Sequence, residues 1–516
     1  MIQLAEIFQD GMILQRRKPI CIWGNNTCTQ NIVISINDIK YVETEIVEGN
    51  FSVQLPAQEA IENATFKLCG NSGDEIFINR VDIGEVWIAG GQSNMEFNLR
   101  FDKEGDAVIN AADDEHFRFY DVGKYAFEGE KEERLKPNRI YWDKWLQFCP
   151  KNAPGFSAVG TYFAMRIREE LKIPVGIIGC NWGGTTASAW LEEKLIRDDP
   201  ELKVYIDAYN NDIRKLNMEK YIVKNRRSRQ QMSSDKIMKQ SDVQLKVEAN
   251  KASSFLVGFI ANMYNSFNKM GPNSENRPGG LYQTMLKKIA GFSCQGVLWY
   301  QGESDDIYAN VYGKLLTKMI DCWRKDWKEE IPFLLVQLAP FETWLGCSGT
   351  NYPLLRQQQQ NVEDTVSKTW LTSIMDVGSR YDIHPKEKQP VGHRLALLAL
   401  DKIYNMEFES QSPRIKQITK NGNEIVIKFQ YLVGGLVIKQ YDDVFSELEN
   451  LFEVEKAGKK LRFEAKIQDD SVILHGTEFG FNGNLTVSFA YQPYCKVNLY
   501  SKSGLPVRPF KEIING

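Results

Sequence analysis

The sequence has few histidines and no cysteine pattern that would bind a metal or close a disulfide framework. Only four histidines occur in 516 residues, which narrows the choice of a general base. The nine cysteines are an odd number and are scattered without a CxxC pair. This argues against a zinc–thiolate site and a disulfide-linked domain, and we expect most of the thiols to be buried apolar side chains.

The chain also lacks a long apolar run and a strong excess of charge. No stretch approaches the roughly 20 apolar residues that span a bilayer. Met1 is followed by polar, alternating sequence and not by the basic and apolar regions of a signal peptide. The net charge of -4 gives no general reason to expect nucleic acid or an anionic membrane as a partner. We therefore expect a cytoplasmic protein, or an exported one whose leader has been removed.

Apolar sequence is sufficient for more than one core. Of the residues, 43% are hydrophobic and 25% are charged, so we expect two or three domains. Residues 1–83 contain short alternating runs such as NIVISI and FSVQL between turn-rich pieces, which predicts an N-terminal β-module. The pattern returns in EIVIKF, SVILHG and LTVSFAY, which predicts a C-terminal β-module over residues 405–516. Both are expected to resemble β-sandwiches.

Residues 84–404 show apolar runs alternating with amphipathic stretches, the pattern of a parallel sheet covered by helices on both faces. Buried strands are predicted at 84–90, 173–180, 295–302, 332–340 and 369–376. A stripe from Val159 to Leu171 and another from Tyr308 to Trp323 predict helices. The charged stretch 191–280 breaks this rhythm and is predicted to be a helical insertion, with a substrate lid as the alternative. The predicted class is α/β, with a three-layer α/β/α domain.

The segment GEVWIAGGQSNME at 84–96 carries the first candidate for chemistry. A run of β-forming residues ends in Gly90 and Gly91, and Ser93 follows at the carboxyl end of the predicted strand. A nucleophilic serine needs a rigid support, a sharp turn and a base within reach. The alternative is a serine that caps a helix at an ordinary strand–turn–helix joint. This segment alone does not decide between the two.

The next two predicted strands end in groups that could stabilise an oxyanion. The second ends in NWGGTT, where Gly183 and Gly184 offer backbone N–H groups. The third ends in WYQGES, where the side-chain amide of Gln301 could add a donor and Glu303 is expected to orient its neighbours. A plain glycine turn and a structural hydrogen bond are the respective alternatives.

The fifth predicted strand ends at Asp376 and leads to Asp382 and His384. A histidine in a loop, with a carboxylate two residues earlier, is placed to accept a proton from a serine while being held in one tautomer. His393 lies in a helical pattern, and neither His116 nor His475 combines a strand end with a carboxylate. Because ligands bind outside the carboxyl ends of parallel strands, these strand ends together predict a serine hydrolase.

The segments GQSNME, NWGGT, WYQGES and DIHP resemble the sialate O-acetylesterase family, a carbohydrate-esterase branch of the SGNH hydrolases. The resemblance extends to FQDGMILQRRKPICIWG near the start and NLYSKSGLPVRPF near the end. It implies that Ser93 is the nucleophile and His384 the general base. It also implies that the oxyanion donors are the backbone N–H of Ser93, the Gly183–Gly184 turn and the side chain of Gln301.

The sequence departs from the SGNH pattern at two places. The wider pattern has asparagine where this chain has Gln301, and it usually places an aspartate three residues before the histidine, where this chain has Tyr381. Asp382 is therefore the first choice for the acid of the triad and Asp376 the second. A Ser–His dyad supported by a backbone carbonyl is the third.

The resemblance implies hydrolysis of O-acetyl esters on sialic acid through a serine acyl-enzyme, with no metal or organic cofactor. The expected partner is an acetylated small molecule or glycan, and neither nucleic acid nor a membrane. The same chemistry serves any exposed sugar acetate, so an esterase of plant polysaccharide such as acetylated xylan is an alternative. An inactive carbohydrate-binding scaffold is an alternative of another class.

Overall fold

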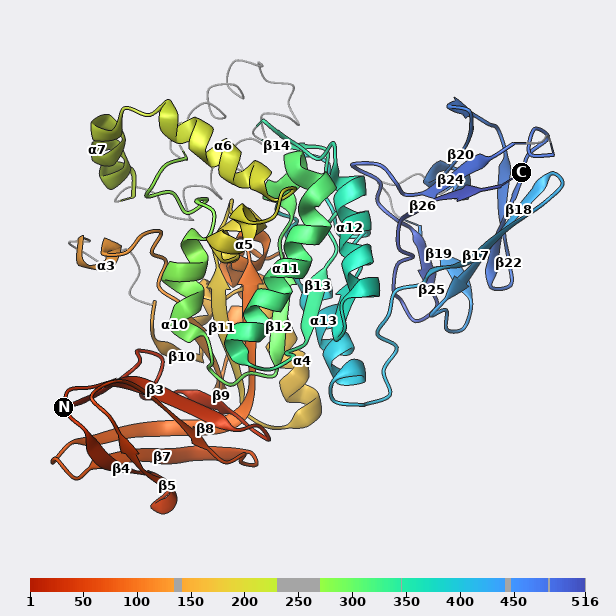
Figure 1. Ribbon diagram of the computed structural model, residues 1–516. Helices are drawn as coiled ribbons and strands as arrows, with labels where there is room; N and C mark the ends of the chain where they lie inside the picture. The colour runs from red at the N-terminus through yellow and green to blue at the C-terminus, as the bar shows by residue number, and fades with distance from the viewer. Residues whose placement is uncertain (134–141, 230–269, 345, 441–446, 481–482, 516) are drawn as a thin grey trace.

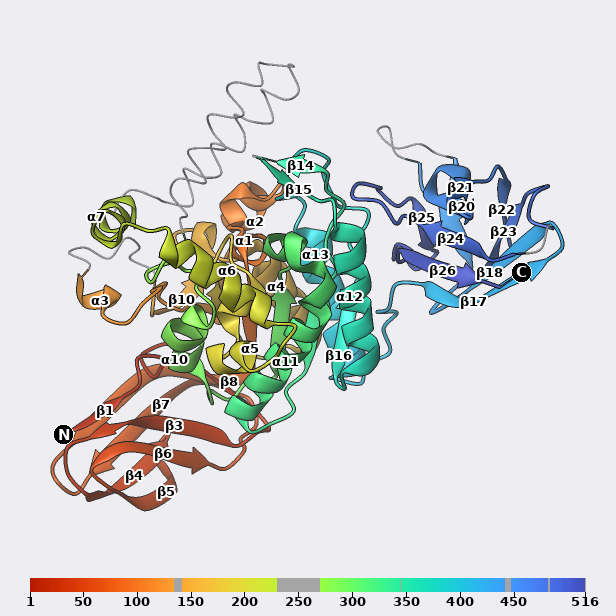
Figure 2. The ribbon, with the colours of Figure 1, turned by 45° about the horizontal axis from the view of Figure 1, so that its top comes forward.

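Three regions of secondary structure follow one another along the chain. The computed structural model describes residues 1–133, 142–229, 270–344, 346–440, 447–480 and 483–515. An N-terminal β region and a C-terminal β region lie at different ends of the molecule, and a region of strands and helices lies between them (Figures 1 and 2). Within the described residues, no helix is both long and apolar enough to cross a membrane.

The N-terminal region consists of short strands whose side chains alternate between core and solvent. These strands are β1 (Ile2–Leu4), β2 (Ile13–Gln15), β3 (Ile20–Asn26), β4 (Gln30–Ile36), β5 (Ile39–Ile46), β6 (Gly49–Leu55) and β7 (Ile61–Gly70). β1, β3 and β6 form one antiparallel sheet, while β4 pairs with β5 and β7. In β4 the isoleucines at 32, 34 and 36 are buried, as the two-residue period of a strand requires.

One long strand, β8 (Glu75–Gly91), joins this region to the central sheet (Figure 1). Its first part pairs antiparallel with β7, and its last part pairs parallel with strands of the central sheet. A Cβ atom at position 84 would lie 2.0 Å from the carbonyl oxygen of Pro174, so the close approach of the two backbones requires Gly84. The boundary predicted between residues 83 and 84 therefore falls inside a continuous strand.

The central sheet has the strand order β10-β9-β11-β8-β12-β13-β16. Its further strands are β9 (Asp114–Asp121), β10 (Trp145–Phe148), β11 (Val175–Asn181), β12 (Gly296–Tyr300), β13 (Phe333–Val336) and β16 (Thr369–Thr372). All neighbours pair in parallel except β9 and β10. The five predicted strands correspond to β8, β11, β12, β13 and β16, and the predicted α/β class is confirmed.

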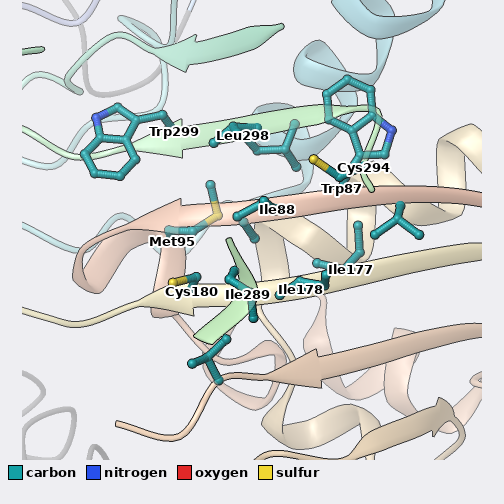
Figure 3. Close-up of a cluster of buried hydrophobic side chains, with 14 of the residues drawn as sticks. Trp87, Ile88, Met95, Ile177, Ile178, Cys180, Ile289, Cys294, Leu298 and Trp299 are labelled. Atoms are coloured by element: carbon teal, nitrogen blue, oxygen red, sulfur yellow. The ribbon is translucent and has the colours of Figure 1, made fainter. Parts of the chain in front are cut away.

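The parallel strands are ordered β9-β11-β8-β12-β13-β16 in space. The direction of winding reverses between β8 and β12, so the crevice expected for a ligand lies where those two strands end. Figure 3 shows side chains of these two neighbouring strands, Trp87 and Ile88 of β8 and Leu298 and Trp299 of β12. All four side chains are buried.

Helices occupy the connections between the strands. They are α1 (Ser93–Glu96), α2 (Gly105–Asn110), α3 (Glu130–Glu133), α4 (Ala158–Leu171), α5 (Glu193–Arg197), α6 (Lys203–Arg214), α7 (Met218–Arg229), α10 (Lys287–Ile289), α11 (Ala309–Trp327), α12 (Tyr352–Thr365) and α13 (Gln389–Lys402). The two predicted stripes correspond to α4 and α11. Helices α5, α6 and α7 occupy the first part of the predicted insertion at 191–280, of which residues 230–269 lie outside the described residues.

The C-terminal region is again formed by strands. They are β17 (Arg414–Asn421), β18 (Glu424–Gln430), β19 (Leu436–Ile438), β20 (Phe452–Lys456), β21 (Lys459–Lys460), β22 (Glu464–Gln468), β23 (Ser471–His475), β24 (Leu485–Phe489), β25 (Leu499–Ser501) and β26 (Phe510–Ile514). They have an apolar core of their own, which Met375 of the central region joins.

Polar contacts fasten the C-terminal region to the loops of the central region. The buried Arg356 of α12 donates hydrogen bonds to the carbonyl oxygens of Gln492 and Pro493, each at 2.8 Å. The backbone N–H of Val497 donates to the carbonyl oxygen of Met375 at 2.9 Å. The loop that follows β16 is thus held by the last part of the chain.

Candidate active site

The turn after β8 presents Ser93 at the carboxyl edge of the sheet. Gly91 has φ of 133°, and a Cβ atom there would lie 2.1 Å from the carbonyl oxygen of Tyr300, so only glycine fits. The N–H of Gln92 donates to that same carbonyl at 3.1 Å. Ser93 then begins α1 and is partly exposed. The turn is therefore sharp, and it is braced against β12.

The glycine loop after β11 lies directly against this turn. A Cβ atom on Gly183 would be 3.2 Å from the Cβ atom of Ser93, so the two residues are in contact range. The N–H of Gly183 donates to Oε2 of Glu96 at 2.8 Å, and Oε1 of Glu96 pairs with Lys124 at 2.6 Å. The structure thus brings Gly183 to Ser93, as predicted, and engages its N–H with a carboxylate of α1.

Gln301 lies at the end of β12, where its side chain is fully buried and joins several loops. Its Nε2 lies 2.5 Å from Oδ2 of Asp305, 3.1 Å from the carbonyl oxygen of Thr185 and 3.2 Å from Oε1 of Gln92. Its Oε1 accepts a hydrogen bond from the hydroxyl of Tyr312 at 3.1 Å. The amide predicted to donate to an oxyanion is therefore surrounded by protein acceptors.

His384 is buried in the loop that follows β16, with its ring edge-to-face against Trp344 at 5.2 Å. Burial and, to a smaller extent, the nearby Lys388 cation lower the pKa of His384 to about 3, while the Glu96 carboxylate acts in the opposite direction. The imidazole is consequently neutral near pH 7, which is the state that can accept a proton. Because the Glu96 carboxylate of α1 affects the pKa of His384, the imidazole ring lies close to α1.

Asn94, the residue after the candidate nucleophile, connects the serine turn to the histidine loop. Its Nδ2 donates to the carbonyl oxygen of Ile383 at 2.9 Å and to Oε1 of Glu303 at 2.5 Å. Ser93 and His384 are the direct neighbours of Asn94 and Ile383 in the chain. The predicted convergence of the first and fifth strand ends is therefore held by a side-chain hydrogen bond.

The two carboxylates considered for the triad have different surroundings. Oδ1 of Asp382 accepts the backbone N–H of His384 at 2.9 Å and lies 3.8 Å from its Nδ1. Asp376 instead forms an ion pair with Arg394 through both oxygens, at 2.7 and 2.6 Å, and accepts from the hydroxyl of Tyr500 at 2.9 Å. Asp382 is thus beside the imidazole, while the oxygens of Asp376 are engaged elsewhere.

Lys388 is the site residue that the sequence reasoning missed. Its side chain is fully buried, and Nζ donates to Oδ1 of Asn94 at 2.5 Å. Burial lowers the pKa of Lys388 to about 7, although the carboxylates of Glu303, Asp382 and Asp102 act to raise it. In the sequence it belongs to the charged run PKEK, whose other lysine, Lys386, is exposed. No local pattern distinguishes the two.

The other histidines lie apart from this constellation. His116 pairs through Nδ1 with Asp82 of β8 at 2.8 Å, so it does have a carboxylate partner, supplied by a distant part of the chain. His475 is exposed on β23, and His393 lies on α13. In the parts of the chain that the structure describes, no group of three or more His, Cys, Asp and Glu side chains is placed to hold a metal ion.

The chain is similar to known carbohydrate esterases. Residues 263–399 match the family model described as carbohydrate esterase, sialic acid-specific acetylesterase. Human sialate O-acetylesterase is 22% identical over 455 residues, which cover 80% of this chain and 73% of the human protein. The mouse sialate O-acetylesterase is also 22% identical and covers 81% and 77% of the two chains.

A solved structure resembles the whole chain. The crystal structure of a carbohydrate acetylesterase from Xanthomonas citri superposes with a TM-score of 0.75 and 26% sequence identity. The likeness covers 99% of this chain and 99% of that one. The two β regions and the central region therefore all have counterparts in a single solved protein.

Proposed function

We propose that this chain hydrolyses acetyl esters of sialic acid through a serine acyl-enzyme. The premise is that it is a carbohydrate O-acetylesterase of the sialate O-acetylesterase family. The observation that carries the mechanism is the bond from Asn94 to the carbonyl of Ile383 at 2.9 Å, because it joins the turn of Ser93 to the loop of His384. The family match and the curated relatives support sialic acid as the substrate.

Within the α/β class, we propose a more specific arrangement of the three regions. We assign the central region to the three-layer α/β/α arrangement of SGNH hydrolases and the two flanking regions to β-sandwich-like modules. The doubly wound strand order supports the first assignment. The antiparallel sheets with alternating burial at both ends of the chain support the second.

In the first half of the proposed reaction, Oγ of Ser93 attacks the acetyl carbonyl carbon while Nε2 of His384 accepts the hydroxyl proton. The tetrahedral intermediate then collapses, the sugar oxygen leaves with the proton from His384, and the acetyl group stays on Ser93. In the second half, His384 takes a proton from water, the resulting hydroxide attacks the acetyl group, and acetate leaves as Ser93 is protonated again.

The oxyanion is proposed to be held by backbone donors at the ends of β8 and β11. Ser93 is the first residue of α1, so its N–H belongs to the helix donors that have no acceptor within the helix. Gly184 follows in the glycine turn, with φ of 77°. Gly183 and Gln301 complete the predicted set, although their N–H groups donate to Glu96 and to buried acceptors here. The N–H groups of Gly183 and Gln301 would donate to the oxyanion only if they gave up these hydrogen bonds.

Replacement of the two candidate acids should separate their roles. We propose that Asp382 orients His384, so Asp382→Asn should lower kcat on p-nitrophenyl acetate by about 10²–10⁴-fold, because the wrong imidazole tautomer is then favoured. Asp376→Asn should lower the thermal unfolding temperature instead, since it weakens a buried ion pair with Arg394. A larger loss of kcat from Asp376→Asn than from Asp382→Asn would reverse the assignment.

The burial of His384 leads to an expected pH dependence. A folded-state pKa of about 3, below the ordinary value of 6.5, keeps the imidazole unprotonated as the pH falls through 6.5. We therefore expect the fall of kcat/KM for p-nitrophenyl acetate on the acid side to occur at pH values well below 6.5. Initial rates measured between pH 4 and 8, corrected for the uncatalysed reaction, test this. A half-maximal kcat/KM near pH 6.5 would contradict it.

Substrate identity is tested by acetate release measured side by side. O-acetylated sialic acid should give the higher kcat/KM, with acetylated xylan as the comparison. The reverse order would favour an esterase of plant polysaccharide. Release from neither substrate, together with no hydrolysis of p-nitrophenyl acetate, would favour the carbohydrate-binding scaffold.

A further inference from the structure

Behind the catalytic loops lies a buried cation that has no part in the proton transfers described above. The ammonium group of Lys388 lies 4.7 Å from the ring centre of Phe97 and 5.6 Å from that of Tyr300, with the side chain fully buried. Its hydrogen-bond acceptor is Oδ1 of Asn94, at 2.5 Å. A buried charge is costly and is tolerated where it has a defined partner. Here that partner is the residue next to the nucleophile.

The carboxamide of Asn94 joins three loops, and it can do so in one orientation. Its oxygen faces the ammonium of Lys388, so both protons on Nδ2 point toward acceptors, namely Oε1 of Glu303 and the carbonyl oxygen of Ile383. A carboxamide rotated by half a turn would place its NH₂ group against the ammonium and its oxygen against a carboxylate. Lys388 and Glu303 thus select between the two orientations from opposite sides.

We propose that Lys388 is a positioning residue of the esterase, which fixes the carboxamide of Asn94 and thereby holds the loop of His384 against the turn of Ser93. This inference rests on the proposed roles of Ser93 and His384. Lys388 acts on the site through its hydrogen bond to Asn94, in addition to the effect of its charge on the pKa of His384. Because a misplacement of about 1 Å can cost about 10²-fold in rate, the expected effect of losing this lysine is on kcat and not on substrate binding.

A purely structural role is the competing explanation, because Lys388 also offsets the buried carboxylate of Glu303. Lys388→Met alone would leave that carboxylate without its cation. The double variant Lys388→Met/Glu303→Gln removes this cation together with the first of the carboxylates that face it, while Asn94 loses its ammonium donor. Asn94→Ala is the third variant. It removes the carboxamide and leaves the ammonium and the carboxylate to offset each other.

The test measures kcat and KM for p-nitrophenyl acetate, the labelling rate of Ser93 by a fluorophosphonate, and the thermal unfolding temperature, all in the full chain. The double variant and Asn94→Ala should each lose about 10²-fold in kcat and in labelling rate, with KM within about twofold of the wild type. The matched control is Lys103→Met. It removes an exposed lysine that pairs with Glu387 at 2.6 Å, one residue before Lys388, and should change neither rate.

Wild-type kcat in a folded double variant, or in folded Asn94→Ala, would overturn the proposal and leave Lys388 as a charge partner only. A rise in KM without a fall in kcat would overturn it as well, because the lysine would then act on binding. Failure of the proposed function has a different signature. In that case the wild-type chain itself would show no hydrolysis that depends on Ser93.

Discussion

Replacement of Ser93 by alanine is expected to lower kcat on p-nitrophenyl acetate by about 10⁴–10⁶-fold. The hydroxyl is the only group at the end of β8 that can form the acetyl-enzyme, so no other residue can substitute for it. A small residual rate over water should remain, because binding and the backbone donors of the oxyanion hole are untouched. Initial rates with purified variant and wild type measure the loss.

The control for this experiment is Ser304→Ala. Ser304 follows the neighbouring strand in the segment WYQGES, and its backbone N–H, which the substitution retains, donates to Gln92 at 3.3 Å. This variant should keep the wild-type kcat. Rapid acid quenching of the wild type during turnover should also yield an acetylated peptide that contains Ser93. An unaltered rate in Ser93→Ala would disprove the mechanism.

Deletion of residues 1–74 is expected to prevent folding of the remaining chain, even though it leaves all of β8 in place. The deletion removes Arg16, which pairs with the buried Glu85 at 2.6 Å, and Gln15, which donates to the same carboxylate at 3.0 Å. An unpaired buried charge costs about 3–5 kcal/mol, and whole domains are stable by only about 5–15 kcal/mol. The deletion also uncovers the apolar side chains that pack under β8.

Soluble expression, far-UV circular dichroism and thermal unfolding test this expectation. Two point variants separate the buried contact from general charge loss. Arg16→Met should lower the unfolding temperature, while Arg17→Met should not, because Arg17 pairs with Glu59 at 2.9 Å between two exposed side chains. A truncated chain that unfolds cooperatively and hydrolyses acetyl esters would refute the prediction.

The sequence allowed the five core strands and the segments that follow them to be located, because their signals are local. Continuous apolar runs mark strands buried on both faces, and small or polar residues directly after them mark the functional edge. Strand β9, which lies between β10 and β11, was missed, since Arg118 and its charged neighbours make it look solvent-exposed. In the fold, Arg118 is buried and pairs with Asp82 at 2.9 Å.

The remaining features depend on contacts between distant parts of the chain. Nothing in the vicinity of Gly84 indicates that β8 continues through the predicted domain boundary, because a glycine there also fits a linker. The burial of Lys388 could not be predicted from the sequence either, since Lys386 and Glu387 beside it are exposed. Gln301 lies at the end of β12, but two of its three acceptors, Gln92 and the carbonyl of Thr185, come from other loops and could not be read from WYQGES.

The fastening of the C-terminal region to the central loops has a consequence for biosynthesis. The contacts of Val497 with Met375 and of Tyr500 with Asp376 involve residues that are translated long after the loop that they hold. The nucleophile turn and its brace on β12 precede this loop in the chain, whereas two contacts of the loop after β16 form only when these later residues arrive. Nascent chains truncated before residue 490 should therefore contain the serine turn and a histidine loop that lacks these two contacts.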